Sequence, residues 1–526
     1  MSEIEYYKTL VATGKMTRRD FMAKSSALGL SVAAATTLLS SSANATPIKG
    51  GHLKVGMAGG QTTDSLDPAT ITQYMPQVMT FASRNCLVEV NAKGEATPEL
   101  AEGWEAKPGA QEWVFNLRKG VEFHNGKTMD ADDVVWSIQH HLGEKSESGA
   151  KGILGGISEI KADGKDRVLV TLTSGNADLP FLLSDYHLQI MPKDEDPASG
   201  IGTGGYQIES FEPGVRFLAK KNPNYFKSDR AHVDSVEILA IEDVAARTSA
   251  LQTGEVHLIN RVDPKTLSLL KRAKNVQILS TAGAQHYTMP MMGDRAPFDN
   301  NDLRLAMKYA IDREQLLKTV LRGYGRVGND HPIAATDQYF ATGLEQRTYD
   351  PDKAAFHFKK AGFEGQTIPL HTSDAAFAGA VDTAVLFKES ASKAGITIDL
   401  VREPNDGYWS NVWMQKNFCF SYWGGRITPD IMFSTAFSSD AAWNEGFWKN
   451  EHFDKILLEA RAELDQDKRK ALYAEMQTMV SNEGSVIIPM FADYLDAATK
   501  NIKGFEYVSV YGMSGFRAPE QVWIDG

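Results

Sequence analysis

Apolar side chains recur at every second position in several short runs of this chain. The runs span residues 51–57, 112–117, 167–172 and 236–241, and a two-residue period places their apolar side chains on one face of a β-strand. Between them lie segments in which apolar residues are three and four positions apart, the spacing of an amphipathic helix. Because strands and helices alternate without a repeat of fixed period, the pattern predicts an α/β protein with mixed sheets.

Polar residues mark where several of these helices are expected to begin. Asp130, Asn300, Asp312 and Asp465 each stand just before an apolar stripe, and a side-chain oxygen there can accept a hydrogen bond from the free N–H groups of the first turn. A later β-like run contains Pro489. Because proline lacks an N–H group, we expect this strand at a sheet edge or as a segment that crosses between sheets.

The N-terminal residues have the order of an export signal. Basic residues at 16–24 precede an apolar run at 27–39, and Ala43-Asn-Ala45 fits a small-x-small cleavage site. The pair Arg18-Arg19 resembles a twin-arginine signal, which implies export of a folded chain by the twin-arginine machinery. The apolar run is short for a membrane span of about 20 residues. We therefore expect cleavage and a soluble periplasmic protein; an uncleaved anchor is the alternative.

The chain as a whole carries a net negative charge. Its formal net charge is −12, and removal of residues 1–45 would leave 50 basic and 64 acidic residues, a net charge of −14. A chain of that charge is not expected to bind nucleic acid or an anionic membrane. About 480 residues remain after the signal, which is enough for two or more domains.

Cysteine usage carries little information. The two cysteines, Cys86 and Cys419, are far apart in sequence, and one pair gives no spacing signature. We favour two buried free thiols over a disulfide, since a chain of this length can bury several cores without one.

Motifs for catalysis or metal binding are not found. The sequence has neither a Gly-x-Ser-x-Gly elbow nor a His-Glu-x-x-His pair, and Gly202-Thr-Gly-Gly205 is expected to form a turn because it lacks the lysine of a phosphate loop. The only adjacent histidines, His140 and His141, would point about 100° apart on a helix. No catalytic residue, metal ligand or cofactor is therefore predicted.

Motifs in four separated parts of the chain occur together in one known family. They are Ser65-Leu-Asp-Pro68 with residues 97–104, 113–126 and 130–135; Gly202-Thr-Gly-Gly-Tyr206 with Asn222-Pro-Asn-Tyr225; residues 251–259; and residues 297–306 with Ala310-Ile-Asp-Arg313. Through them the chain resembles, over residues 50–524, the extracellular solute-binding proteins of family 5, the dipeptide, oligopeptide and nickel class that supplies ABC importers.

The resemblance implies two α/β lobes joined by two crossing strands that act as a hinge, so that the lobes close like jaws on a solute. The expected ranges are 46–282 plus 500–526 for lobe I, about 85–195 for an extra subdomain within it, 283–499 for lobe II, and about 278–287 and 491–498 for the crossing strands.

The segment Tyr422-Trp-Gly-Gly-Arg426 departs from the peptide-binding members of this family. The resemblance implies that an aspartate in this segment holds the α-ammonium of a peptide, and Arg426 stands in its place. The planar fork of arginine suits a carboxylate or phosphate, so we expect a solute with an anionic group near Arg426. The alternative is a structural salt bridge from Arg426 to Asp430 or Glu403.

A second departure lies in the loop at residues 370–375. Dipeptide binders have an arginine for the peptide carboxylate there, whereas this chain offers Asp374. The two anchors are therefore expected to be exchanged, with Asp374 near a cationic group. The alternative for Asp374 is to cap a helix at residues 376–385.

Aromatic residues near these anchors are candidates for the wall of a binding pocket, with core packing as the alternative for each. They could also cage a quaternary ammonium group. Trp423 is the preferred candidate because the glycines after it, Gly424 first, leave its ring accessible. The other candidates are Tyr408, Trp409, Tyr422 and Trp443, with Tyr74 and Tyr287 from lobe I and a crossing strand.

These observations together predict a binding protein that catalyses no reaction. We expect a monomeric periplasmic receptor that captures a small carboxylate-bearing solute, peptide-like, opine-like or another zwitterion, and delivers it to the permease of an ABC importer. A nickel-chelate or haem binder is the alternative within the family. A secreted hydrolase is the alternative outside it.

Overall fold

The computed structural model describes residues 47–143, 146, 148–405 and 407–525. The predicted export signal, with Arg18 and Arg19, lies outside these residues. Residues 50–526 form one compact unit of the chain. Within the described part, every helix is too short or too polar to cross a membrane.

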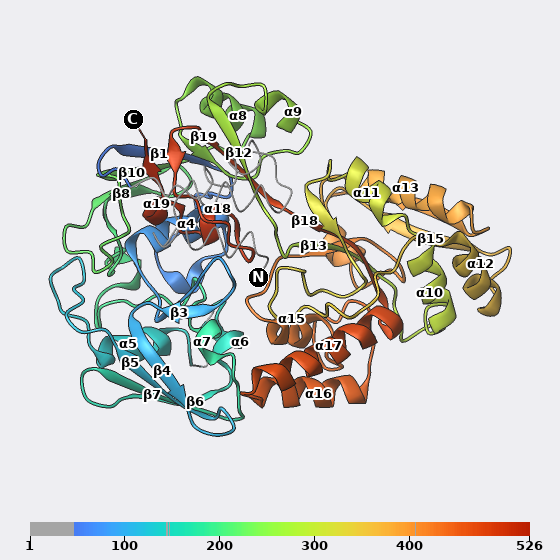
Figure 1. Cartoon of the computed structure of the whole chain (residues 1–526), viewed down its shortest axis with the longest axis horizontal. Coiled ribbons are helices and arrows are strands. Elements are labelled where there is room, and N and C mark those ends of the chain that lie inside the picture. Colours follow the sequence, from blue (N-terminus) through green and yellow to red (C-terminus); the bar gives the residue numbers. More distant parts are fainter. Residues whose placement is uncertain (1–46, 144–145, 147, 406, 526) are drawn as a thin grey trace, which may run out of the picture. The chain divides into compact units, whose positions relative to one another are not determined.

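A seven-stranded mixed sheet is formed by strands from both ends of this unit (Figure 1). Its strands in order are β12 (Val276–Thr281), β19 (Tyr494–Thr499), β11 (Leu258–Ile259), β1 (His52–Met57), β10 (Ser235–Ala240), β9 (Arg216–Lys221) and β8 (Tyr206–Glu212). Strand β1 pairs in parallel with β10 and β11, and the other pairings are antiparallel. Alternate residues of β1 enter the core beneath helix α4 (Tyr74–Ser83), as the two-residue period predicted.

A four-stranded antiparallel sheet contains two more of the predicted strands. Its order is β4 (Ala101–Ala106), β5 (Glu112–Leu117), β7 (Arg167–Leu172) and β6 (Ile157–Ala162). Helix α5 (Ala131–His140) packs against it and begins with a capping box, in which Asp130 accepts a hydrogen bond from the backbone of the first turn and the Asp133 side chain accepts one from the backbone of Asp130. The predicted cap at Asp130 is confirmed.

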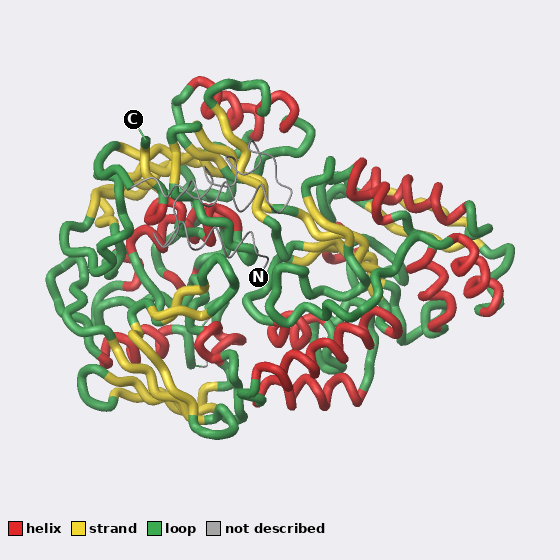
Figure 2. Tube along the Cα trace, viewed as in Figure 1, coloured by secondary structure: helices red, strands yellow, loops and turns green. Residues whose placement is uncertain are grey.

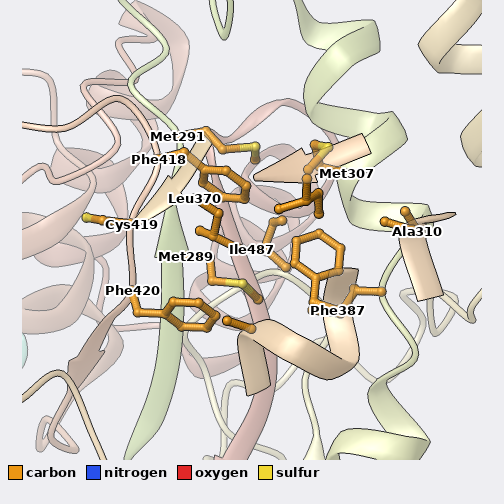
Figure 3. Packing of buried hydrophobic residues seen from close by; sticks show 14 of the residues in the cluster. Met289, Met291, Met307, Ala310, Leu370, Phe387, Phe418, Cys419, Phe420 and Ile487 are labelled. Atoms are coloured by element: carbon orange, nitrogen blue, oxygen red, sulfur yellow. The ribbon is translucent and has the colours of Figure 1, made fainter. Parts of the chain in front are cut away.

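The second half of the chain has a four-stranded antiparallel sheet of its own. Its order is β14 (Gly325–Val327), β18 (Val486–Ala492), β13 (His286–Pro290) and β17 (Ser421–Trp423), and a parallel pair, β15 (Thr367–Thr372) and β16 (Thr397–Arg402), lies near it. Figure 3 shows Met289 of β13 and Ile487 of β18 packed with Phe418 and Phe420 in the core of this region. Both large sheets are visible as the yellow segments of Figure 2.

The chain passes twice between the seven-stranded sheet and the four-stranded sheet that contains β13 and β18. Strand β12 of the seven-stranded sheet leads directly into β13 of the four-stranded sheet, and β18 leads back through Asp493 into β19. Strand β18 lies between β14 and β13, so the expectation of an edge strand is wrong and that of a crossing segment is right. Pro489 is accommodated because the pairing of β18 with β13 shifts register there, which removes the need for an N–H group.

Helices around the second sheet begin where polar residues predicted. Asn300, Asp312 and Asp465 each accept a backbone N–H at the start of a helix. These helices are α10 (Asn301–Tyr309), α11 (Arg313–Thr319) and α17 (Gln466–Glu483), and α17 runs beside α16 (Glu451–Ala462) (Figure 1). Cys86 and Cys419 are buried free thiols, as expected.

The remaining elements are short or connect the sheets. They are η1 (Pro68–Thr70), β2 (Val88–Val90), β3 (Ala96–Pro98), α6 (Lys151–Leu154), α7 (Leu179–Leu182), η2 (Pro197–Ser199), α8 (Val244–Thr253), α9 (Leu267–Leu270), α12 (Pro351–Lys360), α13 (Ala380–Ser392), α14 (Tyr408–Asn411), α15 (Pro429–Ala436), β20 (Ile502–Lys503), α18 (Gly512–Gly515), α19 (Ala518–Gln521) and β21 (Trp523–Ile524).

A buried carboxylate, Asp330, fixes the loop after β14 to β18. It pairs with Arg313 at 2.8 and 2.7 Å and with Arg347 at 2.6 Å, and it accepts the backbone N–H of Ile488 at 3.0 Å. Burial raises the pKa of Asp330, but these arginines and Lys308 outweigh it and hold that pKa below its usual value. The loop that follows Asp330 is thereby held against the crossing strand.

Replacing this carboxylate should destabilise the protein strongly. Asp330→Asn leaves two buried arginines without their anion, a change that costs about 3–5 kcal/mol, and we expect a clear fall in melting temperature by circular dichroism. The control is Glu112→Gln, which breaks an exposed pair with Lys107 worth at most about 1 kcal/mol. Equal melting temperatures for the two variants would contradict this account.

Candidate functional site

A cavity lies where the crossing segments meet the loops after β14 and β17. The space in it that water-sized molecules can reach has a volume of ≈ 40 Å³. It is lined by Gly94, Ala284, His286, Pro332, Ile333, Ala334, Thr336, Asp337, Gln338, Tyr339, Arg426, Ile427, Thr428, Pro429, Met432, Ser509 and Val510. The lining therefore comes from both predicted lobes.

The turn after β17 brings Arg426 to this cavity. Strand β17 pairs with β13, with Trp423 opposite His286, and Thr428 caps α15 two residues after Arg426. Between them, a Cβ atom at Gly425 would lie 3.0 Å from the Ala284 Cβ atom and 3.0 Å from the Val510 carbonyl oxygen. A side chain at position 425 would crowd both neighbours, so glycine favours the close approach of this turn to Ala284 and Val510.

The guanidinium of Arg426 forms no ion pair with any residue that the structure describes. Its Nη1 atom contacts the carbonyl oxygens of Gly424 at 3.3 Å and Gly425 at 3.2 Å. The two carboxylates suggested as structural partners are engaged elsewhere, since Asp430 binds Arg461 and Glu403 binds His371. The positive charge of Arg426 is therefore available to a ligand.

Trp423 supports Arg426 from the protein side. The guanidinium lies 5.5 Å from the Trp423 ring centroid, a cation–π distance. The indole N–H of Trp423 donates to buried Glu445 at 3.1 Å, and Trp413 and Thr288 donate to the same carboxylate. Burial raises the pKa of Glu445 despite these donors. These hydrogen bonds fix the ring, which does not itself line the cavity.

His286 is a neutral wall of the cavity. Its side chain is 1% exposed, and burial lowers its pKa to about 4. Its Nδ1 atom lies 3.1 Å from the carbonyl oxygen of Ala284, which can only accept, so Nδ1 carries the proton. The Nε2 atom has no hydrogen-bond partner among the described residues and is left as an acceptor.

Asp337 supplies the carboxylate of the cavity. One of its oxygens accepts the backbone N–H of Tyr339 at 2.7 Å, and burial raises its pKa to about 7. No lysine, arginine or histidine of the described residues forms an ion pair with it. Neither His286 nor Asp337 was predicted; His286 falls within the crossing segment expected from sequence, but Asp337 lies in a loop without any periodic pattern.

Asp374 lies away from the cavity lining. It accepts the backbone N–H groups of Gly379 at 3.3 Å and Val381 at 3.5 Å, at the start of α13. The helix expected at residues 376–385 instead begins at Ala380, because Gly379, with a φ of +94°, ends the preceding turn. Asp374 therefore does not cap a helix at residues 376–385, and its two hydrogen bonds join it to the turn that precedes α13 and to the first turn of that helix.

The predicted aromatic residues separate into two groups. Tyr287 stacks on Phe377 at 3.8 Å, buried Tyr408 donates to the carbonyl of Phe420, and Tyr74 packs edge-on against Phe516. The other group, Trp409, Tyr422 and Trp443, is exposed and lies in a row beside Trp423, joined by half-buried Trp413. Of the ten predicted binding residues, Arg426 alone lines the cavity.

The described residues contain no group of three or more histidine, cysteine, aspartate or glutamate side chains that could hold a metal ion.

Comparison with known proteins agrees with this architecture. Residues 95–445 match the family described as "Bacterial extracellular solute-binding proteins, family 5 Middle". The "Dipeptide-binding protein" of Escherichia coli (strain K12) is 25% identical over 455 residues, which are 78% of this chain and 84% of that protein.

Two solved structures have the same fold. The DppA protein of Helicobacter pylori in complex with the peptide STSA has a TM-score of 0.74 at 23% identity and covers 91% of this chain and 99% of its own. AgaA in complex with agropinic acid, from A.tumefacien R10, has a TM-score of 0.73 at 22% identity, with 90% and 99% covered. This chain belongs to the bacterial extracellular solute-binding proteins of family 5, and its fold is that of the two-lobe periplasmic binding proteins.

Proposed function

We propose that this protein is the periplasmic solute-binding component of an ABC importer of the peptide and nickel class, and that it captures a small carboxylate-bearing solute at Arg426. The observation that carries the proposal is a half-buried guanidinium that lines a cavity and forms no ion pair among the described residues. A charge placed in such a site interacts strongly with a partner of opposite charge, because little water screens it.

The chemistry of arginine narrows the partner. A guanidinium presents N–H groups in a planar fork that matches both oxygens of a carboxylate. Two of the related proteins hold ligands of this kind, since the Helicobacter pylori protein binds a peptide and AgaA binds agropinic acid. We extend this to a peptide-like, opine-like or other zwitterionic solute for the present chain.

The remaining parts of the proposal follow from the family. Export through the twin-arginine machinery, a monomeric state and delivery to a membrane permease stay predictions. Transport energy would come from the importer's ATPase, and this chain would take up solute stoichiometrically without turning it over. A secreted hydrolase would instead show turnover on ester, glycoside or peptide substrates.

Thermal-shift measurements test the role of Arg426. Residues 46–526 are screened against amino acids, di- and tripeptides, opines, betaines and organic acids. We expect carboxylate-bearing compounds to raise the melting temperature by several degrees, because ligand binding stabilises the folded state. Arg426→Ala should abolish this shift, and Arg426→Lys should retain only part of it, since lysine keeps the charge but not the fork.

The matched control is Arg402→Ala, which removes an exposed arginine at the end of β16 and should leave every shift unchanged. Equal shifts of wild type and Arg426→Ala by neutral or purely cationic compounds would show that Arg426 is structural, and the proposed ligand class would then be wrong.

An ion pair between the predicted lobes supports closure around the solute. Asp178, just before α7, lies 2.6 Å from Arg469 of α17, and both side chains are at most 1% exposed. Beside them, the backbone N–H of Ala177 donates to the carbonyl of Arg461 at 2.7 Å. If the solute is captured by jaw closure, these contacts form on closing and stabilise the bound state.

Asp178→Asn should therefore weaken binding of the best carboxylate from the screen by about tenfold or more, because a buried Arg469 would lose its anion only in the closed state. The melting temperature without ligand should change little. Isothermal titration calorimetry measures the affinity, with Glu459→Gln, an exposed residue of α16, as control. An unchanged affinity would mean that this pair does not contribute to closure.

A further inference from the structure

Two opposite charges line the same cavity without pairing with each other. Arg426 contacts only backbone carbonyls and the Trp423 ring, and Asp337 accepts one backbone N–H from Tyr339. Both residues line the cavity. Across the described residues, neither forms an ion pair. A ligand that bridges them would satisfy both charges at once.

The surroundings of Asp337 leave it without a counter-ion. The nearest cation that acts on it is Arg469, which is already paired with Asp178 at 2.6 Å. The pKa of Asp337 is raised to about 7, chiefly by burial and in smaller part by Asp178, while the Tyr339 N–H and Arg469 act to lower it. Such a carboxylate gains more from a cationic ligand than an exposed one would, because it has lost much of its hydration.

The wall between the two charges does not oppose a cation. His286 is neutral, and its buried Nε2 atom has no hydrogen-bond partner among the described residues, so the ring adds no positive charge to the lining. Arg426 is thus the one cationic side chain in the cavity lining. An ammonium group of a ligand is therefore repelled only near Arg426.

We propose that Asp337 holds a cationic group of the solute, so that the cavity binds a zwitterion with its carboxylate at Arg426 and its ammonium at Asp337. This inference rests on the proposed function. It replaces Asp374 as the expected cation anchor, because the Asp374 carboxylate is engaged by the N–H groups of Gly379 and Val381. It also predicts that the spacing of the two charges in the solute is a determinant of specificity.

Matched ligands with one charge removed test this inference. Alanine, Ala-Ala and 4-aminobutyrate are titrated calorimetrically as the zwitterion, the N-acetylated anion and the carboxamide cation. We expect at least one zwitterion to bind more than tenfold tighter than both of its singly charged forms. Asp337→Asn should weaken that zwitterion about ten- to a hundredfold, the range for a hydrogen bond to a charged group, and leave the N-acetylated form within twofold.

The control is Asp374→Asn, for which all affinities should stay as in wild type. Asp337→Ser serves as a second variant. The pH dependence of binding to the wild-type protein gives an independent readout. Between about pH 5 and 7.5 its affinity for the zwitterion should rise as Asp337, which faces Asp178 and Arg469, loses its proton, whereas its affinity for the N-acetylated form should not.

Each contrary result has a distinct meaning. N-acetylated anions that bind as tightly as the zwitterions, with a dependence on Arg426 but none on Asp337, overturn this inference and leave the proposed function intact. Zwitterions that bind equally well to wild type and both Asp337 variants would also overturn this inference and leave the proposed function intact. Failure of every carboxylate-bearing compound to bind overturns the proposed function, and this inference with it.

Discussion

The pairing of β13 with both β17 and β18 is the constraint on which the site depends. One crossing strand places His286 opposite Trp423 and beside Phe491, and the turn after Trp423 then carries Arg426 to the cavity. Gly425 makes this possible, because the turn passes close to Ala284 on the strand connection and Val510 near the C-terminus. The same strands that join the two sheets therefore position the ligand-facing charge.

The way in which other charged side chains are compensated helps to show what sets Arg426 and Asp337 apart. Arg313 and Arg347 share Asp330, Arg461 binds Asp430, and Arg469 binds Asp178. Buried charges are costly unless they are compensated, and not all of them are compensated by an ion pair here, since buried Arg84, Arg304 and Lys308 bind backbone carbonyl oxygens instead. Arg426 and Asp337 are distinguished by their place in the lining of one cavity, where neither has an ion-pair partner among the described residues.

Local signals predicted much of the fold. The strands at β1, β5, β7 and β10 and the helix caps at Asp130 and Asp312 depend on neighbouring residues only, so periodicity and capping chemistry are sufficient to find them. The central position of β18 depends on β14, which lies about 160 residues away in sequence. Pairings over such distances leave no local pattern, and the position of Pro489 could not reveal them.

The same distinction applies to the site. Arg426 could be predicted because it interrupts a recognisable aromatic and glycine motif, whereas Asp337 lies in an irregular loop whose place is fixed by the distant cluster around Asp330. The resemblance to dipeptide binders instead suggested Asp374, whose carboxylate accepts backbone N–H groups just before and within the first turn of α13. Anchors of a ligand are defined by where loops converge, and convergence is a property of the folded chain.

The proposed role of Asp337 would also connect ligand recognition to closure. Its carboxylate acts on the Asp178–Arg469 pair, since Asp178 raises its pKa and Arg469 lowers it. When both carboxylates are ionised, one guanidinium must compensate two negative charges in a buried place. An ammonium group at Asp337 would supply the second positive charge, so the pair between the lobes would be more stable with a zwitterion bound than without it. Differential stabilisation of this kind is what a ligand needs in order to shift an open–closed equilibrium.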